Sequence, residues 1–220
     1  MEYTFREKIK TLLILLKEPK ILSKLLSLRL SGYLVDVGWF SAFKIGEPVD
    51  KNFEPLPWLT YSFIDFITER LSKEYNVFEF GSGNSTLFFA ERVKQVCSVE
   101  HSGEWYNKLT GKIPGNSNLI LSKSDNTEDY IAGLKQSNLK YDLIIIDGIH
   151  RVDCCLSASN YLTDKGVIIL DDSEREQYNE GIEYLTNKGF KKIDFWGIPP
   201  GMLIRKCTTV FYKSNNCLGI

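Results

Sequence analysis

Residues 78–86 read Phe-Glu-Phe-Gly-Ser-Gly-Asn-Ser-Thr and close an apolar segment that is typical of a buried strand. Gly81 and Gly83 let the backbone turn tightly and approach a ligand where a side chain would clash. A tight turn from a strand into a helix needs the same glycines, so the pair alone is a weak indication of a binding site. Its position after the first strand of the main domain favours a nucleotide-like ligand, because ligands of open parallel sheets bind at the carboxyl ends of the strands.

Around this turn, short apolar strands alternate with helical patterns. Strands are expected at residues 77–80, 96–99, 118–121, 141–147 and 166–170, and helices through 63–71, over 85–93 and from about 174 to 187. This alternation is typical of a parallel sheet that is covered by helices on both faces.

The end of the chain departs from this alternation. Residues 192–196 and 208–212 both have strand patterns, but the segment between them is rich in glycine and proline and has no helical pattern. Two consecutive strands without a crossover helix should be antiparallel. The sequence therefore predicts an α/β fold: a Rossmann-like parallel sheet with helices on both faces and a C-terminal antiparallel hairpin, seven strands in all, plus an N-terminal helical extension.

The N-terminal part differs in composition from the rest. Residues 1–57 are expected to form an amphipathic helical extension with a proline-rich connector, and residues 58–220 the ligand-binding domain. Residues 1–30 hold seven basic and three acidic side chains. Three interpretations stay open for these helices: a cap packed on the main domain, a homodimer contact, or peripheral contact with an anionic membrane surface.

The overall composition excludes several classes of protein. With 43% hydrophobic and 25% charged residues among 220, the chain is a globular protein. Lys plus Arg number 27 and Asp plus Glu 28, and this balance predicts no nucleic-acid partner. No apolar run approaches the ~20 residues of a membrane span. Five cysteines without a CxxC pair predict a reduced, cytoplasmic protein.

Acidic residues follow the second and third predicted strands. Glu100 lies where a carboxylate can accept hydrogen bonds from both hydroxyls of a ribose. Asp125 could accept from an adenine amino group, or cap the helix that begins near Glu128. These two strand ends favour a ligand with an adenosine part.

The same motif lacks the residues that would bind a chain of phosphates. Thr86 occupies the third glycine position of GxGxxG, and no GxxxxGK[ST] segment is present. Glu79 would repel a pyrophosphate but could pair with a cationic amino group. These features favour an adenosine ligand with a positively charged tail over NAD or ATP, and S-adenosylmethionine fits that description.

Residues 58–212 resemble the class I S-adenosylmethionine-dependent methyltransferases. The resemblance rests on FEFGSGNST, on SVEHS around Glu100, on the strand end YDLIIIDG and on the terminal hairpin, while LPWLTYSFIDFI and DFWG resemble small bacterial members. It implies these cofactor-binding positions: Gly81, Ser82 and Gly83 in the turn at the methionine part, Glu79 near its amino group, Glu100 at the ribose and Asp125 facing the adenine.

Three aspartates follow the fourth and fifth predicted strands: Asp147, Asp171 and Asp172. If these strands are neighbours, the three carboxylates converge, and they would repel one another unless a cation or a proton intervened. Oxygen ligands suit Mg²⁺, so a metal site is expected at these aspartates. Alternatively, Asp172 or Ser173 caps the following helix, which would explain one aspartate and leave two unexplained.

This arrangement is similar to that of metal-dependent O-methyltransferases of the catechol and macrocin types. In the catechol enzymes an aspartate and an Asp-Asn pair hold Mg²⁺, and a catalytic lysine lies three residues after the first aspartate. Here that position is His150 and the Asn position is Asp172. His150 and Asp147 are therefore expected to be catalytic, since a neutral imidazole with a pKa of ~6.5 can take a proton from a hydroxyl. His150 could instead only orient its loop, and His101 is expected to line the cofactor site.

We therefore predict an S-adenosylmethionine-dependent O-methyltransferase that acts on a hydroxyl of a small-molecule or glycan acceptor, such as a sugar or polyol, with Mg²⁺ as a second cofactor. Residues 31–57 and 197–205 are expected to shape the acceptor pocket. A metal-independent enzyme whose aspartates bind substrate hydroxyls directly is an alternative within the fold. A nicotinamide-dependent oxidoreductase and a non-catalytic cofactor-binding module are alternatives from other classes.

Overall fold

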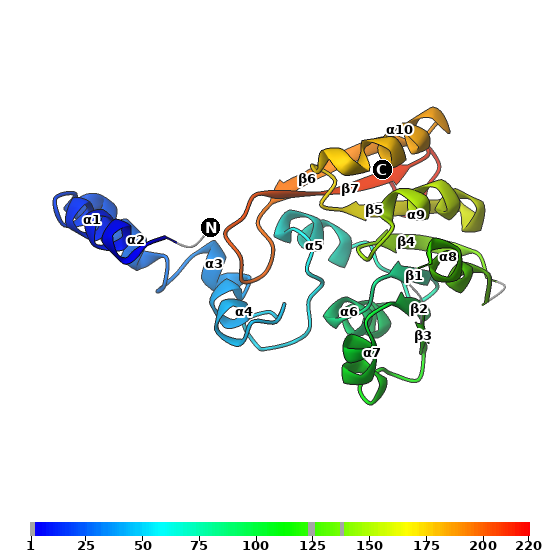
Figure 1. Cartoon of the computed structure of the whole chain (residues 1–220), viewed down its shortest axis with the longest axis horizontal. Helices are drawn as coiled ribbons and strands as arrows, with labels where there is room; N and C mark the ends of the chain where they lie inside the picture. The colour runs from blue at the N-terminus through cyan, green and yellow to red at the C-terminus, as the bar shows by residue number, and fades with distance from the viewer. Residues whose placement is uncertain (1–2, 123–125, 137–138) are drawn as a thin grey trace.

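A computed structural model describes residues 3–122, 126–136 and 139–220. The chain forms a seven-stranded sheet in the order β3-β2-β1-β4-β5-β7-β6, with helices on both faces (Figure 1). Its strands are β1 (Asn76–Phe80), β2 (Gln95–Glu100), β3 (Ser117–Leu121), β4 (Tyr141–Ile146), β5 (Leu162–Asp171), β6 (Lys191–Gly197) and β7 (Lys206–Tyr212). The predicted α/β class and strand set are confirmed.

The helices fall into an N-terminal group and a group that covers the sheet. The first group is α1 (Phe5–Leu16), α2 (Pro19–Ser27), α3 (Tyr33–Asp36) and α4 (Trp39–Ile45). The second is α5 (Tyr61–Thr68), α6 (Asn84–Arg92), α7 (Gly103–Thr110), α8 (Thr127–Gln136), α9 (Arg151–Ala158) and α10 (Asn179–Asn187), with short 3-10 turns at Ser159–Tyr161 and Glu176–Tyr178.

Alternation along the strands builds a separate core on each face of the sheet. Val77 packs with Phe63 of α5 on one face, whereas its neighbour Phe78 packs with Tyr130 of α8 on the other. Successive side chains of a strand point to opposite faces, so continuous apolar strands such as β4 serve both cores. This explains why the central strands show no polar alternation.

The last two strands form the predicted antiparallel hairpin. β7 lies between β5 and β6 and is antiparallel to both, with Asp171 opposite Thr208 and Thr208 opposite Phe195. The first five strands in the chain pair in parallel. This register carries the start of β7 to the carboxyl end of β5.

The predicted helix from residue 174 begins later than expected. Asp172 adopts a left-handed conformation, with φ 52°, and α10 starts only at Asn179. The backbone N–H of Ser173 donates to Cys207 O at 3.1 Å, and Glu174 Oε2 accepts from Cys207 N at 2.8 Å. These bonds to β7 hold the segment out of the helix, so the interpretation of Asp172 as a helix cap is wrong.

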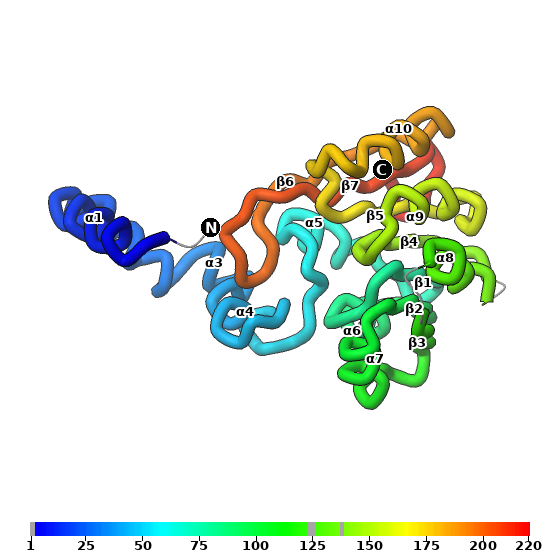
Figure 2. Tube along the Cα trace, in the orientation of Figure 1, coloured from blue at the N-terminus to red at the C-terminus, as the bar shows by residue number. Residues whose placement is uncertain are grey.

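The helices α1 and α2, here called the N-terminal arm, have no buried residue. In Figure 2 the arm projects away from the sheet. Its exposed large apolar side chains range from 43% exposed at Ile9 to 77% at Phe5. The N-terminal arm therefore does not form a cap packed on the main domain. Homodimer contact and peripheral membrane contact stay predictions. Among the described residues, no helix has both the length and the apolar character needed to cross a membrane.

Two tryptophans join the segment before the sheet to the connection between β6 and β7. The indole of Trp39 donates to Met202 O at 2.9 Å, and that of Trp58 donates to Pro200 O at 2.9 Å. Gly201 packs so closely on α4 that a Cβ would lie 2.9 Å from the Phe43 nitrogen. Residues 198–205 are thus fixed beside α4.

The predicted domain boundary near residue 57 stays a prediction. Trp39, which precedes this boundary, lies in the same hydrophobic core as Val77 of β1.

Candidate functional site

A cleft of about 380 Å³ lies at the carboxyl ends of the central strands. One side is lined by the glycine turn and the end of β2: Glu79, Phe80, Gly81, Ser82, Gly83, Asn84, Ser85, Glu100, His101 and Trp105. The other side is lined by Trp58, Asp147, Gly148, Asp171, Asp172, Arg175, Pro199, Met202, Ile204 and Lys206, with Glu47 and Pro48 at the rim. Both segments that were expected to shape an acceptor pocket contribute to its wall.

The glycine turn joins these two sides. Gly81 has φ 99°, and a Cβ there would lie 3.1 Å from the backbone oxygen of Asp147. A Cβ on Gly83 would meet nothing within 4 Å, although Gly83 lines the cleft. Gly81 is therefore needed for the turn itself, whereas the open space at Gly83 is left for a ligand.

Glu100 is held tightly between the turn and the end of β2. Its Oε2 accepts from the backbone N–H of Ser82 at 3.0 Å and from the Ser82 hydroxyl at 2.8 Å. Its Oε1 accepts from the N–H groups of His101 at 2.9 Å and Ser102 at 2.8 Å. A carboxylate bonded to this many donors is fixed in place at the wall of the cleft.

Glu79 is a buried acid at the base of the cleft. Its side chain accepts a hydrogen bond from the Ser98 hydroxyl at 2.8 Å, and no salt bridge joins it to any described residue. Burial raises the pKa of Glu79 to about 7, although hydrogen bonds from Thr86 and Ser98 oppose the shift. A cationic ligand group beside this carboxyl would favour its ionised form.

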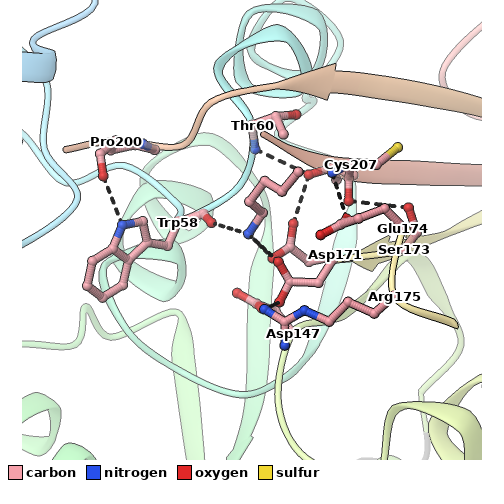
Figure 3. Close-up of polar contacts among 12 residues, drawn as sticks. Trp58, Thr60, Asp147, Asp171, Ser173, Glu174, Arg175, Pro200 and Cys207 are labelled. Atoms are coloured by element: carbon pink, nitrogen blue, oxygen red, sulfur yellow. Dashed lines mark hydrogen bonds and ion pairs between the residues drawn. The ribbon is translucent and has the colours of Figure 1, made fainter. Parts of the chain in front are cut away.

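The three predicted aspartates converge on the other side of the cleft, together with three cations. Figure 3 labels Asp147, Asp171 and Arg175 of this cluster. Arg151 pairs with Asp147 at 3.1 Å and with Asp172 at 3.2 Å, and Arg175 pairs with Asp172 at 2.7 Å. The Lys206 ammonium pairs with Asp171 and, at 3.0 Å, with Asp172. Three positive side chains thus balance three negative ones.

These aspartates do not fit a metal ion. The Lys206 ammonium already lies between Asp171 and Asp172, and the Thr208 hydroxyl donates to the other oxygen of Asp171 at 2.8 Å. Among the described residues no group of three or more candidate ligands is arranged to hold a metal. The expected Mg²⁺ site is therefore not supported, because amino-acid cations neutralise the carboxylates that were assigned to it.

The charge balance sets the ionisation of each acid. Burial raises the pKa of Asp147 and of Asp171. Burial would also raise the pKa of Asp172, but Lys206, Arg151 and Arg175 outweigh it, so this pKa is lowered. For Lys206, the nearby aspartates outweigh burial and raise the pKa of the ammonium. Lys206 therefore stays charged. Asp147 and Asp171 both have a raised pKa and a place on the cleft wall, but the side chain of Asp147 is 30% exposed and that of Asp171 only 1%.

The two histidines differ in position. His101 lines the cleft, and its Nδ1 lies 3.2 Å from Glu100 Oε1. His150 is in a left-handed conformation before α9, with its Nδ1 3.3 Å from the hydroxyl of Thr127, and is not among the residues that line the cleft. The catalytic role of His150 stays a prediction, and Asp125 lies outside the described residues.

Three site residues were missed by the sequence patterns: Arg151, Arg175 and Lys206. Arg151 follows His150 directly, and its spacing from Asp147 could have suggested an ion pair across the first turn of α9. Lys206 begins β7, two residues before the predicted strand 208–212, and only the register of the hairpin brings it to Asp171. No local sequence pattern predicts the pairing register of β7.

A family model described as "Methyltransferase domain" matches residues 78–173, which hold the strand ends from Glu79 to Asp172. No curated protein matches the chain in sequence. The fold is similar to that of a precorrin-6y C5,15-methyltransferase from Geobacter metallireducens, with 14% identity, a TM-score of 0.53, and coverage of 70% of this chain and 87% of that one. It is also similar to that of a precorrin 8w decarboxylase from Methanobacterium thermoautotrophicum, with 17% identity, a TM-score of 0.51, and coverage of 69% and 88%.

The fold is also similar to that of a third solved structure. It is described as a tRNA (m1A58) methyltransferase from Aquifex aeolicus, with 14% identity, a TM-score of 0.49, and coverage of 69% of this chain and 66% of that one. The exclusion of a nucleic-acid partner rested on net charge alone and does not stand, because a balanced total charge is compatible with a local basic surface such as residues 1–30. The family match and the strand order agree with the resemblance of the sequence motifs to the class I S-adenosylmethionine-dependent methyltransferases: residues 78–173 match a methyltransferase domain, and the sheet has the fold of these solved structures.

Proposed function

We propose that this protein transfers the methyl group of S-adenosylmethionine to a hydroxyl group of a sugar or similar polyol. The observation that carries the proposal is the close contact between the glycine turn and Asp147, where a Cβ on Gly81 would lie 3.1 Å from the Asp147 backbone oxygen. A cofactor bound over the turn therefore lies beside a carboxylate that lines the same cleft.

The residues on the turn side fit the cofactor. The buried Glu79 carboxyl suits the amino group of the methionine part, Gly83 leaves space beside it, and Glu100 lies where the ribose hydroxyls would share its oxygens. S-Adenosylmethionine supplies a methyl group already activated by its sulfonium. The protein then contributes mainly the in-line placement of the acceptor, an effect worth up to ~7–11 kcal/mol in favourable cases.

On the acceptor side, we assign to Asp147 the role of the general base that takes the proton from the acceptor hydroxyl. Its side chain is 30% exposed, and its raised pKa makes it a stronger base than an ordinary aspartate. Arg175, about half exposed, and the aspartates offer hydrogen bonds to further hydroxyls. Trp58 and Trp105 add flat apolar faces that suit a sugar ring. This is the metal-independent alternative, in which aspartates bind the acceptor directly.

The test is methyl transfer by the wild-type protein to a panel of acceptors: sugars and nucleotide sugars, polyols, a catechol and unmodified tRNA. The expected product is a methyl ether on a sugar or polyol, formed equally well with EDTA present. Methylation of nitrogen or carbon, or of RNA alone, would overturn the proposal. Calorimetry with S-adenosylhomocysteine and NAD separates the oxidoreductase alternative, and binding without transfer to any acceptor would support the non-catalytic module.

A further inference from the structure

Lys206 is a buried cation with a complete set of partners. It is the first residue of β7, and its side chain is 8% exposed. Its ammonium donates to Asp171 Oδ2 and to the backbone oxygen of Trp58 at 3.1 Å, and it forms an ion pair with Asp172 Oδ1 at 3.0 Å. An ammonium has three N–H donors, and three oxygens of the protein lie within 3.1 Å of this one. These contacts suit a lysine that holds other groups of the site in place.

The surroundings of this ammonium are those that a hard metal ion prefers. Oxygens from two aspartates and one backbone carbonyl surround the positive charge, and such oxygens are the usual ligands of Mg²⁺ and Ca²⁺. The register of the hairpin puts the lysine there. Lys206 and Thr208 lie two residues apart on the same face of β7, and both side chains bind Asp171.

The same contacts tie the acids to the acceptor wall. Trp58 accepts from Lys206 through its backbone oxygen, and its indole donates to Pro200 O at 2.9 Å (Figure 3). A chain of direct contacts thus runs from Asp171 through Lys206 and Trp58 to the 198–205 segment. A change at Lys206 is therefore expected to affect this wall more than the glycine turn, because none of these contacts involves the turn.

We propose that Lys206 is the built-in cation of this site: a positioning residue that takes the place between Asp171 and Asp172 which a divalent metal ion would otherwise occupy, and that fixes the acceptor wall through Trp58. The kinetic part of this inference rests on the proposed function. The ion-binding part does not, because it can be measured without any acceptor.

The first test is Mn²⁺ binding, followed by electron paramagnetic resonance, to the wild type, Lys206→Ala and the control Lys191→Ala, whose exposed lysine begins β6. Removing the ammonium leaves an excess negative charge in a buried cluster, so Lys206→Ala should bind Mn²⁺ at least about tenfold more tightly than the other two. Adding Asp171→Asn to Lys206→Ala should abolish the gain. A folded Lys206→Ala protein that binds Mn²⁺ no better than the wild type overturns the proposal.

The second test separates positioning from general support of the fold. Lys206→Ala should raise the KM for the acceptor at least about tenfold, since the wall loses its anchor, while the Kd for S-adenosylhomocysteine changes less than about twofold. Lys206→Arg, which keeps the charge, and Mn²⁺ added to Lys206→Ala should each restore part of the acceptor affinity. Equal losses of acceptor and cofactor affinity would assign Lys206 to the fold alone and overturn the inference.

If Lys206→Ala does not fold, Lys206→Gln takes its place in both tests, because its amide keeps a hydrogen-bond donor and removes the charge. The expectations and the contrary outcomes are the same. If the wild-type protein methylates no hydroxyl, the proposed function is overturned. The Mn²⁺ comparison would still decide the role of Lys206.

Discussion

The Ser98 hydroxyl donates a 2.8 Å hydrogen bond to the buried carboxyl of Glu79, which forms no salt bridge with any described residue. Burial raises the pKa of this carboxyl to about 7. Since the ionised form pairs with the amino group of the cofactor, the affinity for S-adenosylhomocysteine should rise as the pH goes from 6 to 8. Calorimetry across this range measures the profile.

Glu79→Gln should remove this pH dependence and weaken binding at pH 8 by about tenfold or more, because the charged partner is lost. Glu91→Gln, at an exposed position of α6, is the matched control and should keep the wild-type profile. A flat profile in the wild-type protein would mean that Glu79 does not titrate against the ligand.

The buried Glu79 carboxyl is also expected to lower the free energy of unfolding of the cofactor-free protein at high pH. The pKa of Glu79 is about 7 in the fold and 4.5 as its ordinary value, so the folded state holds the proton more strongly. Its contribution to the free energy of unfolding is full below pH 4.5 and is lost as the pH rises through 7, by up to about 3 kcal/mol. Glu79→Gln should therefore raise the Tm of the ligand-free protein relative to wild type more at pH 8 than at pH 5. An equal effect at both pH values would contradict this origin.

The two glycines of the turn should respond differently to alanine. At Gly81 the left-handed backbone and the nearby Asp147 oxygen both oppose a Cβ, so Gly81→Ala should lower the free energy of unfolding by about 1–3 kcal/mol. Gly83→Ala meets no atom and should leave the Tm nearly unchanged, yet it should weaken cofactor binding because its methyl enters the cleft. Denaturant unfolding and calorimetry on both variants check the contrast. Equal stability of the two variants would show that the turn tolerates the side chain.

Local patterns predicted the elements that short-range chemistry controls. The apolar run before Gly81, the glycine turn and the strand ends at Glu100 and Asp147 all lie where the patterns placed them. The convergence of the aspartates also followed, because β4 and β5 are neighbours.

Long-range register accounts for what was missed. Cys207 forms hydrogen bonds with Ser173 and Glu174. These bonds prevent the helix from starting near residue 174, where the local sequence favours it. Lys206 reaches Asp171 through the same pairing, so the partner that excludes a metal lies far away in the sequence. A single sequence predicts that β6 and β7 are antiparallel but not which residues face each other.

Asp147 and His150 give a direct comparison of two candidate bases. Asp147 lines the cleft, whereas His150 contacts Thr127 and is not among the lining residues. Asp147→Asn should reduce kcat by about 10²–10⁴-fold with cofactor binding retained, and His150→Ala should reduce it by less than about tenfold. The measurement is single-turnover methyl transfer to a hydroxyl acceptor. A loss in His150→Ala as large as that in Asp147→Asn would restore the histidine as the base.

The position of β7 has a consequence for synthesis of the chain on the ribosome. Within the part of the chain that the structure describes, β6 pairs only with β7, which follows it in the sequence, so the growing chain carries β6 without a neighbour until residues 206–212 have emerged. Until then Asp171 and Asp172 also lack the lysine that neutralises them. The site is therefore completed only after every other strand of the sheet has been translated, and a chain cut short before residue 206 would carry the cofactor turn with an unfinished acceptor wall.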